Sequence, residues 1–334
     1  AQAGLAAVIA ELVGKGVLAQ GTEPALDENA LGEAWADLGA SFNGSASADR
    51  LSFALRSLSY PDLLAQAAQL AARQIGQPAF APALWQRERE RLKAALKEAD
   101  TRPATLANRA FNQAVYGTHP YGYEMTEATL AQIFVADLRA HHAALLAPCR
   151  ARVSVVGALN RAQADALVST LLARLPQTAC TDLPSLPAVP EVAALTRAQD
   201  IRIGFQAAQA QVLLGQPGYV RKDPDFFALL VGNHILGGGG FVSRLTHEVR
   251  EKRGLSYGVY SGFAPGLHAG AFTIGLQTRP DQAAQALALA HAVLQRFVAD
   301  GPTEAELKAA KDHLIGGFAL RIDSNRKLLD NVAN

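Results

Sequence analysis

The sequence predicts an α+β protein built from two halves of similar layout. Apolar residues recur with the spacing of helix faces over long segments, and shorter segments alternate polar and apolar residues as half-buried strands do. Prolines cluster between the two halves, over residues 176–190. With 334 residues, 49% of them hydrophobic, the chain is long enough for two cores. We therefore expect domains over residues 1–180 and 195–334, joined by a proline-rich linker.

The first half begins with two helices, over residues 4–13 and 28–38. Two strands follow over residues 41–48 and 51–58, where polar and apolar residues alternate. The remaining helical patterns of this half cover residues 61–75, 83–99, 103–116, 126–146 and 162–175. The mostly apolar run over residues 151–159 predicts a buried strand before the last of these helices.

The second half repeats this plan. Its strands are predicted over residues 201–206, 211–217, 256–262 and 270–278. Its helices are predicted over residues 223–236, 242–252, 280–299 and 303–320, with a glycine-rich turn between the first two. The junction at residues 297–302 is similar in layout to residues 80–82, since each precedes a charged helix. This layout indicates an internal repeat of two α+β halves.

The charge balance excludes several classes of partner. The 31 basic and 30 acidic residues leave a net charge of +1, so nothing favours binding to nucleic acid or to an anionic membrane.

The uncharged stretch over residues 227–242 contains Asn233, His234 and four glycines, which would make it a poor membrane span. The two cysteines, Cys149 and Cys180, are too few for a disulfide framework or a cysteine zinc site, and their pairing stays open.

Motifs for nucleotide or metal binding are also absent from the sequence. Residues 14–16 do not complete a phosphate-binding G-x-x-x-x-G-K-[ST] loop, and the four glycines do not fit G-x-G-x-x-G. The eight histidines supply no metal site, because His141 and His142 are adjacent and His247 lacks the second histidine of H-E-x-x-H. We expect no nucleotide and no metal in this chain.

Residues 4–16, with the sequence GLAAVIAELVGKG, are typical of an apolar helix. They also resemble the helix that carries the inverted zinc signature H-x-x-E-H in the pitrilysin/insulinase (inverzincin) peptidases. On that register Ala7 and Glu11 replace the two ligand histidines, and Ala10 replaces the general-base glutamate. A methyl group can neither bind zinc nor accept a proton from a metal-bound water. The resemblance therefore implies a degenerate zinc site.

The third zinc ligand of that family is a glutamate on a later helix. Counting back from Pro103 places its position near Ala94 or Ala95, while Glu88 or Glu90 is the alternative if the loops differ in length. These two glutamates alternate with arginines along the helix, a pattern typical of a solvated helix face.

The second half carries the most specific resemblance. Residues 236–245, LGGGGFVSRL, and residues 248–257, EVREKRGLSY, resemble the second-domain signature of the pitrilysin-like family. The resemblance implies two homologous pitrilysin-like α/β sandwich domains of the LuxS/processing-peptidase type. It also implies that Arg250 and Tyr257 reach a substrate carbonyl held by an active zinc domain. By themselves, Arg250 could instead complement the end of its helix and Tyr257 could be a half-buried strand residue.

The glycine-rich turn has a role of its own in this reading. It is expected to approach the substrate backbone closely, and the residues concerned are Gly237, Gly238, Gly239, Gly240 and Phe241. The simpler interpretation is a helix-ending turn that needs positive φ angles.

The resemblance implies a zinc-free subunit that is not a peptidase alone. It would form a heterodimer with a zinc-bearing homologous subunit, complete a chamber for a peptide substrate, and contribute Arg250 and Tyr257 to hydrolysis there. The alternatives are a structural scaffold subunit of a larger complex and a self-sufficient metallopeptidase with a different register. A periplasmic location is expected, with the cytoplasm as the alternative. The family pattern also implies further segments before and after these 334 residues.

Overall fold

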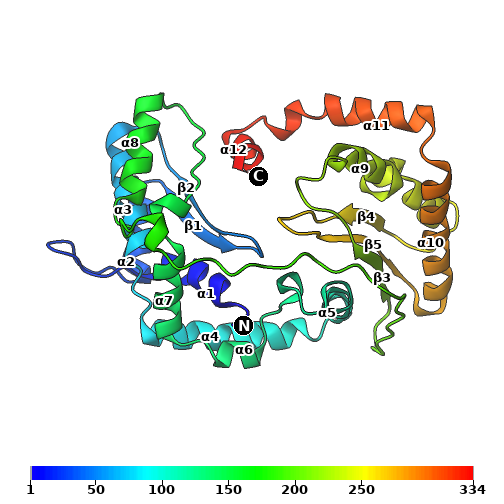
Figure 1. Ribbon diagram of the computed structural model, residues 1–334, viewed down its shortest axis with the longest axis horizontal. Coiled ribbons are helices and arrows are strands. Elements are labelled where there is room, and N and C mark those ends of the chain that lie inside the picture. Colours follow the sequence, from blue (N-terminus) through cyan, green and yellow to red (C-terminus); the bar gives the residue numbers. More distant parts are fainter. Residues whose placement is uncertain (1, 334) are drawn as a thin grey trace. The chain divides into compact units, whose positions relative to one another are not determined.

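The computed structural model describes residues 2–333, which form two compact units of mixed helix and sheet (Figure 1). Unit 1 contains residues 2–96, 124–187 and 319–333. Unit 2 contains residues 97–123 and 188–318. Each unit thus includes a segment from the other predicted half, an exchange that the contiguous ranges 1–180 and 195–334 did not foresee.

Unit 1 packs helices around a two-stranded antiparallel sheet. Strand β1 (Ser41–Ala46) pairs with β2 (Leu51–Arg56), and helix α1 (Leu5–Leu12) lies against β1. Helices α3 and α8 run side by side in this unit (Figure 1). The further helices are α2 (Glu28–Asp37), α3 (Pro61–Gly76), α4 (Pro82–Ala99), α6 (Glu127–Ala131), α7 (Val135–Leu145), α8 (Arg161–Leu172) and α12 (Asn325–Ala333). Residues 82–96 of α4 belong to unit 1, and its last three residues belong to unit 2.

The core of unit 1 forms around the apolar face of α1. Val8, Ile9 and Leu12 are fully buried there, packed with side chains of α4 and α7. Burying each such side chain contributes about 1.5–3 kcal/mol relative to leaving it exposed. Trp85 joins this core, and its indole N–H donates to the backbone oxygen of Ile133 at 3.1 Å. The helix predicted over residues 4–13 is thus fixed by burial on one face.

Unit 2 contains a three-stranded antiparallel sheet with the order β3–β5–β4. Its strands are β3 (Ala210–Pro217), β4 (Val259–Phe263) and β5 (Ala271–Thr278). Its helices are α5 (Pro103–Tyr116), α9 (Phe226–Asn233), α10 (Ala283–Asp300) and α11 (Glu304–Gly316). Leu214 of β3 packs in a core shared with α10, while the next residue, Gly215, meets Phe111 of α5. The alternation along β3 therefore gives the sheet one face for each helix.

The single helix predicted over residues 126–146 is wrong, because two helices, α6 and α7, occupy this segment. The Asp137 carboxylate accepts the backbone N–H of Phe134 at 2.8 Å, which starts a second helix at Val135. The buried Ile133 side chain anchors the break between them in the core. Helix α12 was not predicted.

The strands predicted over residues 151–159 and 201–206 are also wrong. Within the described residues, the backbones of segments 152–156 and 193–209 form no hydrogen bond to another backbone group. The side chains of Ile201, Ile203 and Phe205 alternate as in a strand, yet they are 41–53% exposed. They line a cavity of about 750 Å³ together with α5 and β3. The strand pattern is present, but no neighbouring strand pairs with it.

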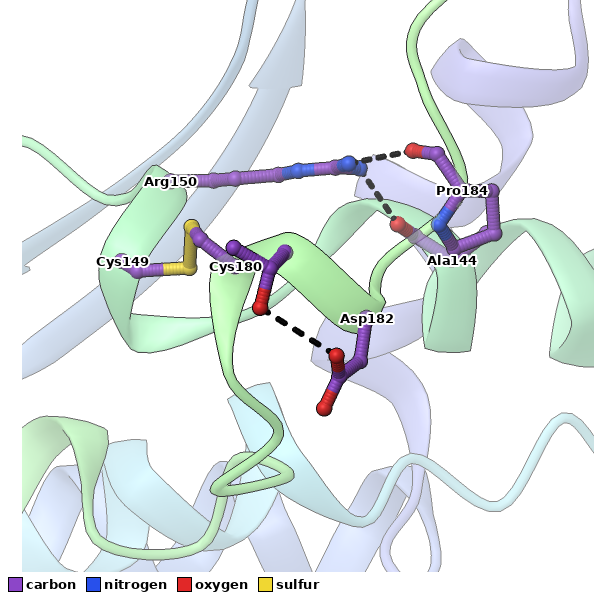
Figure 2. Close-up of a disulfide and its surroundings, with 7 residues drawn as sticks. Ala144, Cys149, Arg150, Cys180, Asp182 and Pro184 are labelled. Carbon is purple, nitrogen blue, oxygen red and sulfur yellow. Dashed lines mark hydrogen bonds between the residues drawn. A yellow bond between two sulfur atoms is a disulfide. The ribbon is translucent and has the colours of Figure 1, made fainter.

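A disulfide joins Cys149 to Cys180 within unit 1 (Figure 2). It ties the turn after α7 to the start of the proline-punctuated segment, with a Cα–Cα distance of 6.0 Å. The neighbouring Arg150 guanidinium donates to the backbone oxygens of Ala144, at 2.7 Å, and Pro184. The beginning of the linker is therefore attached to unit 1 by a covalent bond and by hydrogen bonds.

We expect reduction of this disulfide to destabilise unit 1. The cysteines lie 31 residues apart, and closing a loop of that length lowers the entropy of the unfolded chain by the equivalent of about 3–4 kcal/mol. Urea unfolding with and without a phosphine reductant measures the loss. The Cys149→Ser/Cys180→Ser variant should match the reduced protein and show no response to reductant. An unchanged unfolding midpoint on reduction would contradict this expectation.

Candidate functional site

The second-half signature folds as a series of short turns between α9 and β4. Helix α9 continues into a π-helical turn, η5 (His234–Gly238), and then a 3-10 turn, η6 (Gly240–Val242). A second π-helical turn, η7 (Thr246–Glu251), follows before β4. The regular helices predicted over residues 223–236 and 242–252 are thus partly wrong. Single π-helical turns are rare and are frequently found at functional sites.

Close packing against β4 explains the glycine-rich turn. A Cβ atom on Gly237 would lie 2.5 Å from both the backbone nitrogen and the hydroxyl of Ser261. Gly240 has a φ angle of +61°, in the left-handed region that favours glycine. Asn233, just before the turn, holds it to β4. Its side-chain amide accepts from the Ser261 hydroxyl at 2.7 Å and donates to the Ser261 backbone oxygen at 3.2 Å. Sequence reasoning missed this pair, since 28 residues separate its members.

Arg250 and Tyr257 lie together, and Phe241 joins them in what we call the Arg250 cluster. The guanidinium carbon of Arg250 lies 4.6 Å from the ring centroid of Phe241 and 4.9 Å from that of Tyr257. Both distances are within cation–π range. The rings are 66% and 84% exposed, respectively, so the cluster faces solvent in this chain.

The Arg250 guanidinium has no hydrogen bond or ion pair within residues 2–333. The acid nearby in sequence, Glu248, is already paired at 2.8 Å with both Lys252 and Arg253. Hydrogen bonds from Lys252 and Arg253 lower the pKa of Glu248 to about 2, so it stays ionised and paired. Arg250 thus keeps its N–H donors available, and a guanidinium of this kind can bind a carbonyl or a developing oxyanion.

The positions that the resemblance predicts to be a degenerate zinc site, Ala7, Ala10 and Glu11, lie on α1. Ala7 is exposed, while Ala10 is buried beneath β1, where a Cβ on Gly44 would lie 2.2 Å from the Ala10 backbone oxygen. Glu11 pairs with Arg91 of α4. Among residues 2–333, no group of three histidine, cysteine, aspartate or glutamate side chains could hold a metal ion.

Glu88 is not on a solvated helix face, contrary to the sequence-based interpretation, because only 3% of it is exposed. Its carboxylate lies 3.0 Å from Lys15 and from Arg87 and 2.6 Å from Arg91. Although burial raises the pKa of Glu88, hydrogen bonds from these three cations outweigh it and hold the pKa at about 2. We call this group, completed by Glu11 and Glu28, the Glu88 network.

The network joins α1 to α4 with three carboxylates and three cations. Arg91 contacts both Glu11 and Glu88, so a guanidinium links the position of the second histidine to α4. Ala94 and Ala95, one turn further along α4, are exposed and offer no ligand. Sequence reasoning missed the network because its members come from three separate segments.

The histidines singled out from the sequence take structural positions. His142 is buried and its Nε2 lies 2.7 Å from the backbone oxygen of Ile75, and burial lowers its pKa. His247 pairs with Glu251 at 3.0 Å on the surface of η7. None of the helices within the described part of the chain combines the length and the hydropathy needed to cross a membrane.

The family profile described as "Peptidase M16 inactive domain" matches residues 133–314, more than half of the sequence. The chain therefore belongs to the peptidase M16 family, that of the pitrilysin and insulinase peptidases. A crystal structure of a peptidase M16 inactive domain from Pseudomonas fluorescens is 34% identical, with a TM-score of 0.91 over 99% of this chain and 77% of that chain. A protease from Helicobacter pylori shares the fold, with a TM-score of 0.82 at 19% identity over 98% of this chain and 77% of its own.

Curated relatives are longer than this chain. An uncharacterized zinc protease of Mycobacterium leprae is 29% identical over 70% of this chain and 52% of that protein. An uncharacterized zinc protease of Bacillus subtilis is 29% identical over 72% of this chain and 57% of that protein. The chain thus spans about half the length of these two relatives.

We expect the Glu88 network to stabilise unit 1 in a pH-dependent way. The pKa of Glu88 is about 2 in the folded chain against an ordinary 4.5, so the unfolded chain binds more protons between these values. This contribution is therefore complete above pH 4.5 and is lost as the pH falls towards 2. At pH 7, Glu88→Gln should lower the free energy of unfolding by about 1–3 kcal/mol, since Lys15, Arg87 and Arg91 lose a buried partner.

Urea unfolding from pH 7 to pH 2.5 measures this effect. The matched control is Glu90→Gln, because Glu90 is exposed on the same helix and, in the described part of the chain, pairs with Lys93 alone. The control should change stability by less than about 0.5 kcal/mol. Equal losses of unfolding free energy for Glu88→Gln and Glu90→Gln would show that burial of Glu88 does not contribute to stability.

Proposed function

We propose that this chain is the zinc-free subunit of a heterodimeric M16 metallopeptidase, in which it completes the peptide-binding chamber of a zinc-bearing homologue. The supporting observation is an asymmetry between the two signatures. Ala7 and Ala10 cannot bind zinc, whereas Arg250 and Tyr257 lie side by side with guanidinium donors unused. A site that has lost its metal but keeps its oxyanion donors suits a role beside a metal held by another chain.

In this proposal Arg250 stabilises the charge that develops on the substrate carbonyl oxygen during hydrolysis, and a zinc ion held by the partner would supply the activated water. The planar guanidinium offers two N–H groups in fixed geometry, and the Tyr257 hydroxyl can add a third donor. Gly237 is buried against β4, but Gly238 and Gly240 of the glycine-rich turn are exposed and have no side chains, so a peptide backbone could approach the turn closely there. Phe241, at the end of this turn, is the fifth residue of the predicted substrate-binding stretch, and its ring lies against Arg250.

A scaffold role is the second candidate. It is favoured by one relative, the "Non-peptidase homolog YmxG" of Helicobacter pylori, which is 33% identical over 38% of this chain and 29% of that protein. A scaffold would need the surfaces of both units but not the free donors of Arg250.

The decisive experiment compares peptidase activity of this chain, of a zinc-bearing M16 homologue, and of their mixture, with the metal content of each measured. We expect zinc in the homologue only and activity only in the mixture. Arg250→Ala should lower kcat/KM of the mixture by about 100-fold or more, as expected for loss of an oxyanion donor. Tyr257→Phe should lower it less, since one neutral donor is removed.

Arg279→Ala is the matched control, because Arg279 is an exposed arginine of unit 2 whose one partner among residues 2–333 is Asp281. Its mixture should retain full activity. If the homologue alone is fully active and this chain changes nothing, the scaffold role replaces the proposal. Stoichiometric zinc in this chain would instead support a self-sufficient peptidase.

We also propose that the protein is located in an oxidising compartment such as the periplasm. The cytoplasm is the alternative. The exposed Cys149–Cys180 disulfide supports this, because such bonds persist mainly in oxidising compartments. One structural neighbour, at 20% identity, is described as the periplasmic protease PqqL from Escherichia coli, and that location is a property of the neighbour. Alkylation of intact cells before lysis tests the proposal: we expect both cysteines to resist modification until reductant is added, whereas alkylation without reductant would favour the cytoplasm.

A further inference from the structure

Among residues 2–333, the Arg250 guanidinium contacts two aromatic rings and has no carboxylate partner, in contrast to Arg244 of the same unit. Arg244 also lies over a ring, 5.1 Å from the centroid of Phe297, but it is fixed by two hydrogen bonds of 2.7 Å to Glu306. No carboxylate of the described residues pairs with Arg250 in this way. A long, partly exposed arginine without a partner would otherwise sample many rotamers, so the rings of Phe241 and Tyr257 must restrict it.

The way in which a guanidinium is held decides whether its donors can be used. A carboxylate partner occupies the N–H groups and neutralises the charge, as Glu306 does for Arg244. An aromatic ring contacts the π face and leaves the in-plane N–H groups free. Holding Arg250 by rings therefore restricts its motion and keeps its charge and donors for a ligand.

Phe241 is itself fixed to the turn that carries Arg250. The fully buried Ser243 donates through its hydroxyl to the Gly240 backbone oxygen at 2.8 Å and also contacts the Thr246 hydroxyl at 3.0 Å. Thr246 is the first residue of η7, the π-helical turn in which Arg250 lies. Ser243 thus links the backbone at Gly240, next to Phe241, to Thr246 at the start of η7. Phe241 and Arg250 therefore lie on one segment that these hydrogen bonds hold together.

We infer that Phe241 is a positioning residue that holds the Arg250 guanidinium in place for the substrate carbonyl, a role that rests on the proposed function. Tyr257 supplies the second ring and, in addition, a hydroxyl. Phe241 has only its ring to contribute, so its effect on catalysis passes through Arg250. The inference assigns to Phe241 an effect on kcat, whereas a residue that only contacts the substrate would change KM.

The first test measures the geometry in this chain alone. In NMR spectra, ring currents of Phe241 and Tyr257 should shift the side-chain protons of Arg250 upfield. Phe241→Leu should remove part of this shift and Phe241→Trp should keep or increase it. Phe226→Leu is the matched control, because Phe226 lies under Arg221 at 4.1 Å, elsewhere in unit 2. An Arg250 signal unchanged by Phe241→Leu would overturn the inference.

The second test uses the active mixture with the zinc-bearing homologue. Phe241→Leu should lower kcat by about three- to tenfold with little change in KM, the range expected for loss of one cation–π contact. Phe241→Trp should retain activity, and so should Val242→Ala, because the exposed Val242 has no ring to offer the guanidinium. A rise in KM at constant kcat would assign Phe241 to substrate contact and overturn the inference.

Chemical rescue separates failure of this inference from failure of the proposed function. The Arg250→Ala mixture should regain activity when methylguanidinium is added, and Phe241→Leu in that background should raise the concentration needed for half-maximal rescue. Equal rescue with and without Phe241 would overturn the positioning role while leaving the in-trans role intact. No effect of Arg250→Ala in the first place would reject the proposed function, and the NMR test would still decide the geometry.

Discussion

A side chain at Gly237 would overlap the backbone and hydroxyl of Ser261, so the glycine-rich turn and strand β4 approach more closely than ordinary residues allow. The rest of the candidate site depends on this contact. It draws the end of α9 into a π-helical turn, and the Asn233–Ser261 hydrogen bonds hold that turn to the sheet. The short turns that follow then bring Phe241 beside Arg250, nine positions further along the chain.

The two units differ in how their charged side chains are paired. In unit 1 the buried carboxylate of Glu88 is surrounded by cations, and Arg91 connects it to Glu11 on α1, the helix whose sequence resembles a zinc-binding helix. Attraction between these charges links α1 to α4, a connection that a metal ion can provide in a metal-binding domain. In unit 2 the carboxylate of Glu248 pairs with Lys252 and Arg253, and the guanidinium of Arg250 has no carboxylate partner within residues 2–333.

Local patterns in the sequence predicted most of the helices, because the buried faces of helices such as α1 and α10 repeat with a helical period. The family resemblance located Arg250 and Tyr257, and the structure brings them within contact distance. Structural features that depend on contacts between residues far apart in the sequence could not be predicted. The break before α7 depends on the buried Ile133, and the burial of Glu88 depends on cations from other segments. A strand pattern, as at residues 201–205, cannot reveal whether a pairing partner exists.

The unpaired segment at residues 201–205 has a consequence for the behaviour of the chain in solution. Unpaired N–H and C=O groups beside exposed Ile201, Ile203 and Phe205 form a template on which another extended chain can add. Asp200 and Arg202, an exposed ion pair at 2.8 Å, place charges within this apolar run. Flanking and interspersed charges of this kind act as gatekeepers against self-association. Removing them would leave this unpaired apolar segment as a site of aggregation.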